Sequence, residues 1–164
     1  MAVILDGNRR WANLVGLREP GAGHRHGADK LDELLRWCAG LGNDELTVWA
    51  LSSENLARAS DELAALLEIL SEKLSALSER GRRHGSGIRI RVFGRLKTLP
   101  PALAETVRRV EAQTADQRGL CLNVALGYSG RDELVDATKA LIRSLAAEGI
   151  FDRGDAQPRR HRRG

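Results

Sequence analysis

Short apolar runs alternate with longer stretches of helical periodicity along most of this chain. The runs cover residues 2–5, 46–51, 88–92 and 120–126 and predict four strands. Between and after them, leucine and valine recur every three or four residues, which predicts amphipathic helices. Alternation of this kind favours an α/β fold with a mainly parallel sheet flanked by helices on both faces.

Terminal signals give the predicted helices their ends. One helix is expected from Gly27 to about Gly40, and a second from Ser60, along a stripe of leucines at 63–77, to Gly81. Pro101 opens a third helix, and a fourth spans about 134–145. The first run, 2–5, predicts a buried strand, whereas the arginines that alternate with apolar residues in 88–92 place that strand near the sheet edge.

The composition is that of a globular protein, with 42% hydrophobic and 29% charged residues. No apolar run approaches the ~20 residues that a membrane span needs, so we expect a cytoplasmic protein. We predict one domain over residues 1–150 and a basic, disordered tail over 151–164, which carries much of the net charge of +4. That tail offers at most a peripheral membrane contact, and we expect no nucleic-acid partner.

Polar loops follow three of the predicted strands. Because the carboxyl ends of parallel strands meet at one edge of a sheet, these loops should face the same crevice. The loops are Asp6-Gly7-Asn8-Arg9-Arg10-Trp11, Ser52-Ser53-Glu54-Asn55-Leu56-Ala57-Arg58 and Gly127-Tyr128-Ser129-Gly130-Arg131.

The first loop contains the residue types that a phosphate site needs. Gly7 lets the backbone approach an anion, and Arg9 and Arg10 supply charge-assisted donors. Asp6 can hold Mg²⁺, which prefers carboxylate and phosphate oxygens. The alternative is a polar turn in which Asp6 only caps a helix.

The second loop offers a similar choice. Ser52 and Arg58 can bind phosphate oxygens, and Asn55 can orient a proton-accepting group. The alternative is ordinary helix capping by the serine or the asparagine.

Four motifs occur in a fixed order: D-G-N-x-R-W, G-H-x-x-G, S-S-E-N and N-V-A-x-x-Y-x-G-R. They resemble the signature of the cis-prenyltransferases, which include undecaprenyl diphosphate synthases, and are most similar to short-chain members that make (Z)-farnesyl diphosphate. The resemblance runs from Ala2 to about Ile150. It implies condensation of isopentenyl diphosphate with an allylic diphosphate to give a Z-isoprenyl diphosphate, with Mg²⁺ as cofactor, an apolar substrate tunnel and a homodimer.

The resemblance also implies roles for individual residues. Asp6 would be the indispensable carboxylate and metal ligand, His24 would assist the leaving group or proton traffic, and Asn55 would be catalytic. The substrate-binding set would be Gly7, Asn8, Arg9, Arg10, Trp11, Arg18, His24, Ser52, Ser53, Glu54, Leu56 and Arg58. Leu56 stands where many members have Trp, which fits a short product.

Other functions compete with this one. The family continues with an arginine-bearing segment, a further strand and helix, and a glutamate that shares the metal, and none of these follows Ile150. The main alternative is therefore an inactive truncated fragment or a non-catalytic relative, although the intact D-G-N-x-R motif favours a catalytic lineage. A nucleotide-binding Rossmann-type enzyme is a third possibility, but the glycines at 21, 23 and 27 have the wrong spacing for its fingerprint.

Overall fold

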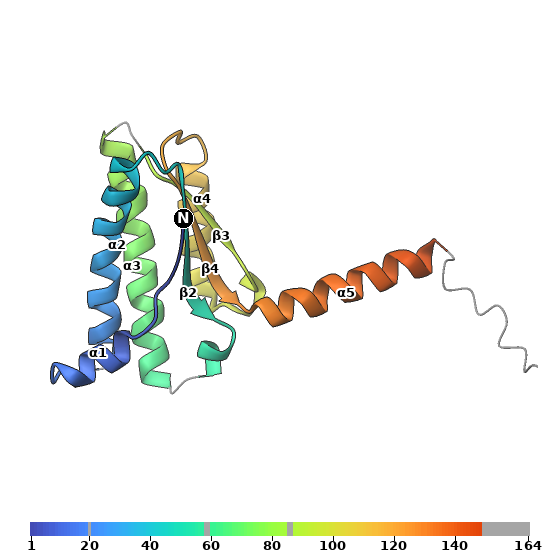
Figure 1. Cartoon of the computed structure of the whole chain (residues 1–164), viewed down its shortest axis with the longest axis horizontal. Helices are drawn as coiled ribbons and strands as arrows, with labels where there is room; N and C mark the ends of the chain where they lie inside the picture. The colour runs from blue at the N-terminus through green and yellow to red at the C-terminus, as the bar shows by residue number, and fades with distance from the viewer. Residues whose placement is uncertain (20, 58–59, 85–86, 149–164) are drawn as a thin grey trace, which may run out of the picture. The chain divides into compact units, whose positions relative to one another are not determined.

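The computed structural model describes residues 1–19, 21–57, 60–84 and 87–148 (Figure 1). It divides the chain into two compact units, Met1–Ser129 and Gly130–Gly164, each of which is described by itself. Arg58 and the predicted tail over 151–164 lie outside the described residues. The single domain over 1–150 stays a prediction.

All four predicted strands form, and they make one parallel sheet in the order β1-β2-β4-β3. Their bounds are β1 Ala2–Ile4, β2 Glu45–Ser52, β3 Arg89–Phe93 and β4 Cys121–Tyr128. The edge position of β3 is confirmed. The prediction of a buried first strand is wrong: β1 forms the other edge of the sheet, where Ile4 is 63% exposed.

Four helices accompany this sheet in the first unit, and α2 and α3 lie side by side (Figure 1). They are α1 Asn8–Leu14, α2 Ala22–Gly40, α3 Ser60–His84 and α4 Pro101–Thr114, with short 3₁₀ turns η1 Glu54–Ala57 and η2 Leu96–Thr98. Pro101 opens α4 as predicted. The start predicted at Gly27 and the end predicted at Gly81 are wrong, because α2 already begins at Ala22 and α3 continues to His84.

One face of the sheet carries the core. Val48, Ile90 and Leu122 alternate along their strands with polar neighbours and are buried together with leucines and valines of α2, α3 and α4. On the opposite face of the sheet, Asn123 of β4 donates to Thr47 Oγ1 of β2 at 3.4 Å. Within the described part of Met1–Ser129, α2, α3 and α4 all contribute to this core, and the predicted α/β fold with a parallel sheet flanked by helices is confirmed.

Helix α4 protects the exposed edge of β3. The backbone N–H of Ile90 donates to Thr114 Oγ1 at 3.1 Å, and that of Val92 donates to Glu111 Oε1 at 2.8 Å. An edge strand otherwise presents unpaired backbone donors that attract another chain. Side chains of α4 thus provide acceptors for these two backbone donors of β3.

The described part of the second unit is the helix α5, Gly130–Ala147, which confirms the helix predicted over 134–145. Its residues Leu134, Leu141 and Ile142 are 71%, 58% and 51% exposed. Among the described residues, no helix has the length and apolar character to cross a membrane.

Candidate functional site

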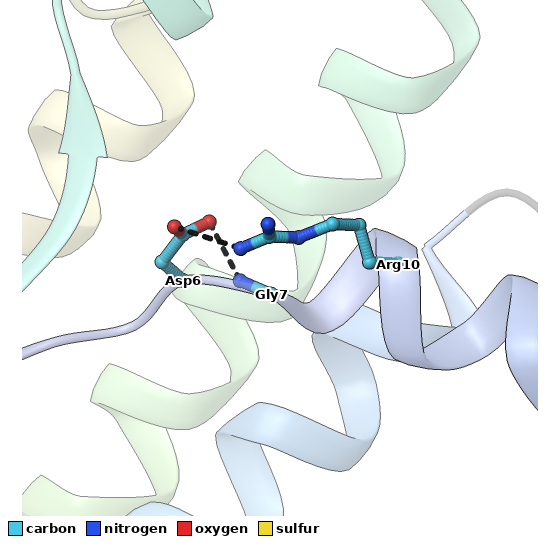
Figure 2. A network of polar contacts seen from close by, with 3 residues as sticks. All are labelled: Asp6, Gly7 and Arg10. Carbon is cyan, nitrogen blue, oxygen red and sulfur yellow. Dashed lines mark hydrogen bonds and ion pairs between the residues drawn. The ribbon is translucent and has the colours of Figure 1, made fainter.

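The loop after β1 folds around its carboxylate (Figure 2). Asp6 Oδ1 accepts the N–H of Gly7 at 2.6 Å, and Arg10 Nη2 donates to Asp6 Oδ2 at 3.3 Å. Gly7 has φ +88°, a conformation that glycine adopts without the steric cost of a Cβ. The N-cap of α1 is Gly7, and no side chain caps that helix, so the capping alternative for Asp6 is wrong.

Glycines of α2 let α1 pack closely. A Cβ added to Gly23 would overlap the backbone carbonyl of Asn8, and one added to Gly27 would lie 2.5 Å from Asn8 Oδ1. These glycines stand one turn apart on α2. The close contact with α1 that they allow offsets their low helix propensity. The G-H-x-x-G motif is therefore a helical contact surface and not the phosphate loop of a Rossmann fold.

A cavity of about 320 Å³ brings together three of the predicted site residues. Arg9 from α1, Arg18 from the following loop and His24 from α2 all line it. His24 Nε2 lies 3.6 Å from Glu62 Oε1, and Arg9 Nη1 lies 3.7 Å from Glu62 Oε2. Two arginines and a histidine therefore lie around this cavity beside the amino-terminal turn of α3, together with the acidic side chains of Glu19, Asp61 and Glu62.

A second cavity, of about 360 Å³, lies at the carboxyl ends of β1 and β2 and is lined by Asp6, Ser52 and Asn55. Ser52 Oγ accepts the backbone N–H of Asn55 at 3.1 Å, so the capping contact predicted as an alternative does form. A hydroxyl has a second lone pair and a proton, and this leaves Ser52 capable of a further hydrogen bond. The crevice predicted from the strand ends is present for the first two loops.

Other predicted residues lie around these cavities with weaker indications of a role. Ser53 donates to Glu54 Oε2 at 3.4 Å, and Leu56 is half-buried against the core. Trp11 is 39% exposed, and its ring centroid lies 4.6 Å from that of His26. Their assignment to substrate binding stays a prediction.

The third loop contacts the second through its backbone. Ser53 N donates to the carbonyl of Tyr128 at 3.4 Å, and the Tyr128 ring meets Trp49 and Phe93 edge-on, with centroids 6.0 and 5.4 Å apart. Gly127 has φ +60° at the end of β4. The carboxyl end of β4 therefore lies beside the loop that follows β2.

Asp6 is the residue that fits a metal. Groups of three or more histidine, cysteine or acidic side chains able to hold an ion do not occur among the described residues. Mg²⁺ in phosphate-handling sites commonly takes one or two carboxylates and completes its shell with phosphate oxygens and water. The Asp6 side chain, 78% exposed at the mouth of the loop, suits such an open site.

Sequence reasoning missed two residues near the site. Glu62 fits the pattern of an acid that favours a helix amino terminus, and nothing local signals its contact with His24. Trp49 lines the cavity with Asp6, and its buried Nε1 has no hydrogen-bond partner. Neither feature has a sequence motif, because each depends on which elements become neighbours.

Comparison with known proteins identifies a family. The family model described as "Putative undecaprenyl diphosphate synthase" matches residues 4–159. A (2Z,6E)-farnesyl diphosphate synthase of Thermobifida fusca is 44% identical over 149 residues, which cover 91% of this chain and 56% of that protein. A tritrans,polycis-undecaprenyl-diphosphate synthase of Methanopyrus kandleri is 43% identical over 141 residues, or 86% and 52% of the two chains.

A solved structure extends the likeness to the fold. Lavandulyl diphosphate synthase of Lavandula x intermedia, in complex with dimethylallyl diphosphate, superposes with a TM-score of 0.81 at 27% identity and covers 93% of this chain. The match takes in 64% of that chain. The present chain spans little more than half the length of the curated relatives that it matches.

Proposed function

The chain belongs to the cis-prenyltransferase family, and we propose that it condenses isopentenyl diphosphate with an allylic diphosphate to form a Z-isoprenyl diphosphate. In this reaction the carbon–oxygen bond between the allylic carbon and its diphosphate breaks. The isopentenyl double bond supplies the electron pair for the new carbon–carbon bond. Loss of a proton from the isopentenyl part then leaves the new double bond, and diphosphate departs.

The observation that carries the proposal is the arrangement around Asp6. A carboxylate held by Gly7 N–H and Arg10 stands at the carboxyl end of β1, and the cavity beside it also contains Ser52 and Asn55. Parallel α/β sheets bind their ligands at this edge. Charge-assisted donors next to a single exposed carboxylate suit a diphosphate that arrives with a divalent cation.

The cationic residues of α1 and the following loop would bind the allylic diphosphate. Arg9 and Arg18 line one cavity, and Arg10 lies beside Asp6. Charge that develops on a departing diphosphate is stabilised best by donors already in place before reaction. Arg58 and the backbone at Gly7 complete the proposed set.

Mg²⁺ would be held by Asp6 and would neutralise charge on the diphosphate. The ion pair with Arg10 orients the Asp6 carboxylate at the carboxyl end of β1. When the diphosphate binds, Arg10 can turn from Asp6 to a phosphate oxygen, since both side chains are largely exposed, at 79% and 78%.

Proton removal would fall to groups in the two cavities. Asn55 lies in the cavity with Asp6 and can orient the accepting oxygen, whereas His24 borders the cavity with Arg9 and Arg18. His24 is the only one of these side chains whose charge ordinarily changes near neutral pH. We assign it to the leaving group or to proton transfer.

The prenyl chain would extend away from these loops between α2 and α3. Leucines of the α3 stripe, Leu66, Leu74 and Leu77, face the core there and are 5%, 3% and 2% exposed. At the amino ends of the strands a cavity of about 480 Å³ has an apolar side formed by Leu35, Leu77, Ile88 and Leu120, and its other lining residues include the charged Asp32, Arg36, Arg80 and Arg118. We propose that this apolar side accommodates the chain, and that two copies of the protein pair as family members do.

The function is tested by incubating the protein with labelled isopentenyl diphosphate and, in turn, dimethylallyl, geranyl and farnesyl diphosphates, with and without Mg²⁺. The proposal expects label in a longer prenyl diphosphate only when Mg²⁺ and an allylic partner are both present. Absence of labelled product, from protein shown by circular dichroism to be folded, would contradict catalysis and favour a non-catalytic relative.

A further inference from the structure

Glu62 lies where three helices meet. It belongs to the first turn of α3, and its carboxylate contacts His24 of α2 and Arg9 of α1 through different oxygens, at 3.6 and 3.7 Å. The Glu62 side chain is 22% exposed and that of His24 is 15% exposed, so this contact is partly shielded from water. Both partners line the cavity that also contains Arg18.

The two adjacent arginines of α1 have different carboxylates. Arg10 pairs with Asp6, whereas Arg9 pairs with Glu62. Each of the two arginines is therefore paired with a different acid, and the two guanidinium groups point toward different carboxylates. The Arg9 side chain is 67% exposed, so Glu62 biases its direction without fixing it, and a side chain biased toward its bound direction loses less conformational entropy when it binds an anion.

We propose that Glu62 is a positioning residue, which holds the His24 imidazole and the Arg9 guanidinium in the orientation that receives the diphosphate. This assignment rests on the proposed function for its ligand. A carboxylate beside Nε2 favours a proton on that nitrogen, which selects one tautomer of the neutral imidazole and a direction for its ring. Glu62 itself does not touch the substrate in this account.

Removal of the Glu62 carboxylate either weakens or strengthens diphosphate binding, and this direction distinguishes a positioning role from simple charge repulsion. Glu62 carries a negative charge near an anion site, so its removal without any positioning role would strengthen the binding of diphosphate. If Glu62 orients Arg9 and His24, its removal weakens binding despite the lost repulsion. The two explanations thus predict opposite directions.

The experiment uses the full chain with isotope-labelled histidine and follows the His24 ring signal by NMR while inorganic diphosphate is added. We expect Glu62→Gln to displace that signal in the free protein and to weaken diphosphate binding about threefold, the scale of one partly exposed ion pair. The matched control is Glu72→Gln on the same helix, since Glu72 also joins α3 to α2 through a 2.9 Å ion pair with Arg25. It should change neither quantity.

A second test adds the Glu62 substitution to a protein in which both of its partners have been replaced. In a His24→Asn, Arg9→Ala background, Glu62→Gln should no longer weaken binding and should strengthen it. Tighter or unchanged binding of Glu62→Gln in the natural background, or an equal effect of Glu72→Gln, would overturn the assignment.

Failure of the proposed function would look different. If the His24 ring signal of the natural protein does not change when diphosphate is added, that result contradicts diphosphate binding at this site. The displacement of the free His24 signal by Glu62→Gln would still report whether Glu62 positions the ring, and an undisplaced signal would overturn the inference.

Discussion

The α-carbon of Gly23 stands so close to the backbone carbonyl of Asn8 that a Cβ at position 23 would overlap it. This contact joins α1, which follows the Asp6 turn, to α2, which carries His24. The relative placement of the two proposed catalytic elements therefore depends on a glycine.

We predict that Gly23→Ala destabilises the protein by about 2 kcal/mol, because the backbone must shift to relieve the overlap. Urea denaturation measures the change. The matched control is Gly40→Ala at the other end of α2, where a Cβ meets nothing within 4 Å. That variant should be neutral or gain up to about 1 kcal/mol, and equal losses for both variants would contradict the packing argument.

Thr114→Val should leave the backbone N–H of Ile90 without its acceptor. Because that bond is buried, we expect a loss of about 1–3 kcal/mol in the free energy of unfolding and faster amide exchange at Ile90. Thr138→Val in α5 is the control: Thr138 donates to the carbonyl four residues earlier, as Thr114 does, but it is exposed. Unchanged exchange at Ile90 would argue against edge protection by α4.

Asp32 of α2 pairs with two cations of α3. Its Oδ2 lies 3.0 Å from Lys73 Nζ and 2.9 Å from Arg80 Nη1. Burial alone would raise the pKa of Asp32, but the hydrogen bonds and charges of Lys73 and Arg80 outweigh burial and hold this pKa below its ordinary value of 3.8. The ionised form is therefore favoured in the folded state.

We predict that Asp32→Asn costs about 1–2 kcal/mol at pH 7, whereas Asp29→Asn, on the exposed side of α2, costs little. A depressed folded-state pKa gives stability that is fully present above the unfolded value of 3.8 and is lost as the pH falls through the folded value. Urea denaturation from pH 7 down to pH 3 should show the difference between the natural protein and Asp32→Asn shrinking at the acid end. A constant difference would contradict the assignment.

Much of the sheet could be predicted because local patterns determined it. The charged alternation at Arg89 and Arg91 indicated an edge strand, and Pro101 indicated a helix start; both are confirmed. The place of β1 at the other edge could not be predicted, because exposure of Ile4 depends on strand order and not on its own sequence.

The meeting of the first two loops at one crevice could be predicted from the sequence, whereas the contacts of individual side chains could not. Asp6 and Asn55 were expected at one crevice and do line one cavity. The low helix propensity of Gly23 hid the true start of α2, and its close approach to Asn8, which a Cβ would block, has no local sequence signal. The contact of Glu62 with His24 joins residues far apart in the sequence and has no local signal.

The central claim is prenyl transfer at the Asp6 loop, and mass spectrometry of the reaction product tests it most directly. The natural protein would be incubated with Mg²⁺, isopentenyl diphosphate and geranyl diphosphate, beside Asp6→Ala and the exposed-surface control Asp29→Ala. We predict a prenyl diphosphate one isoprene unit longer than geranyl diphosphate, made equally by Asp29→Ala and reduced about a hundredfold or more by Asp6→Ala. No longer product from the folded natural protein, or equal product from Asp6→Ala, would contradict the account.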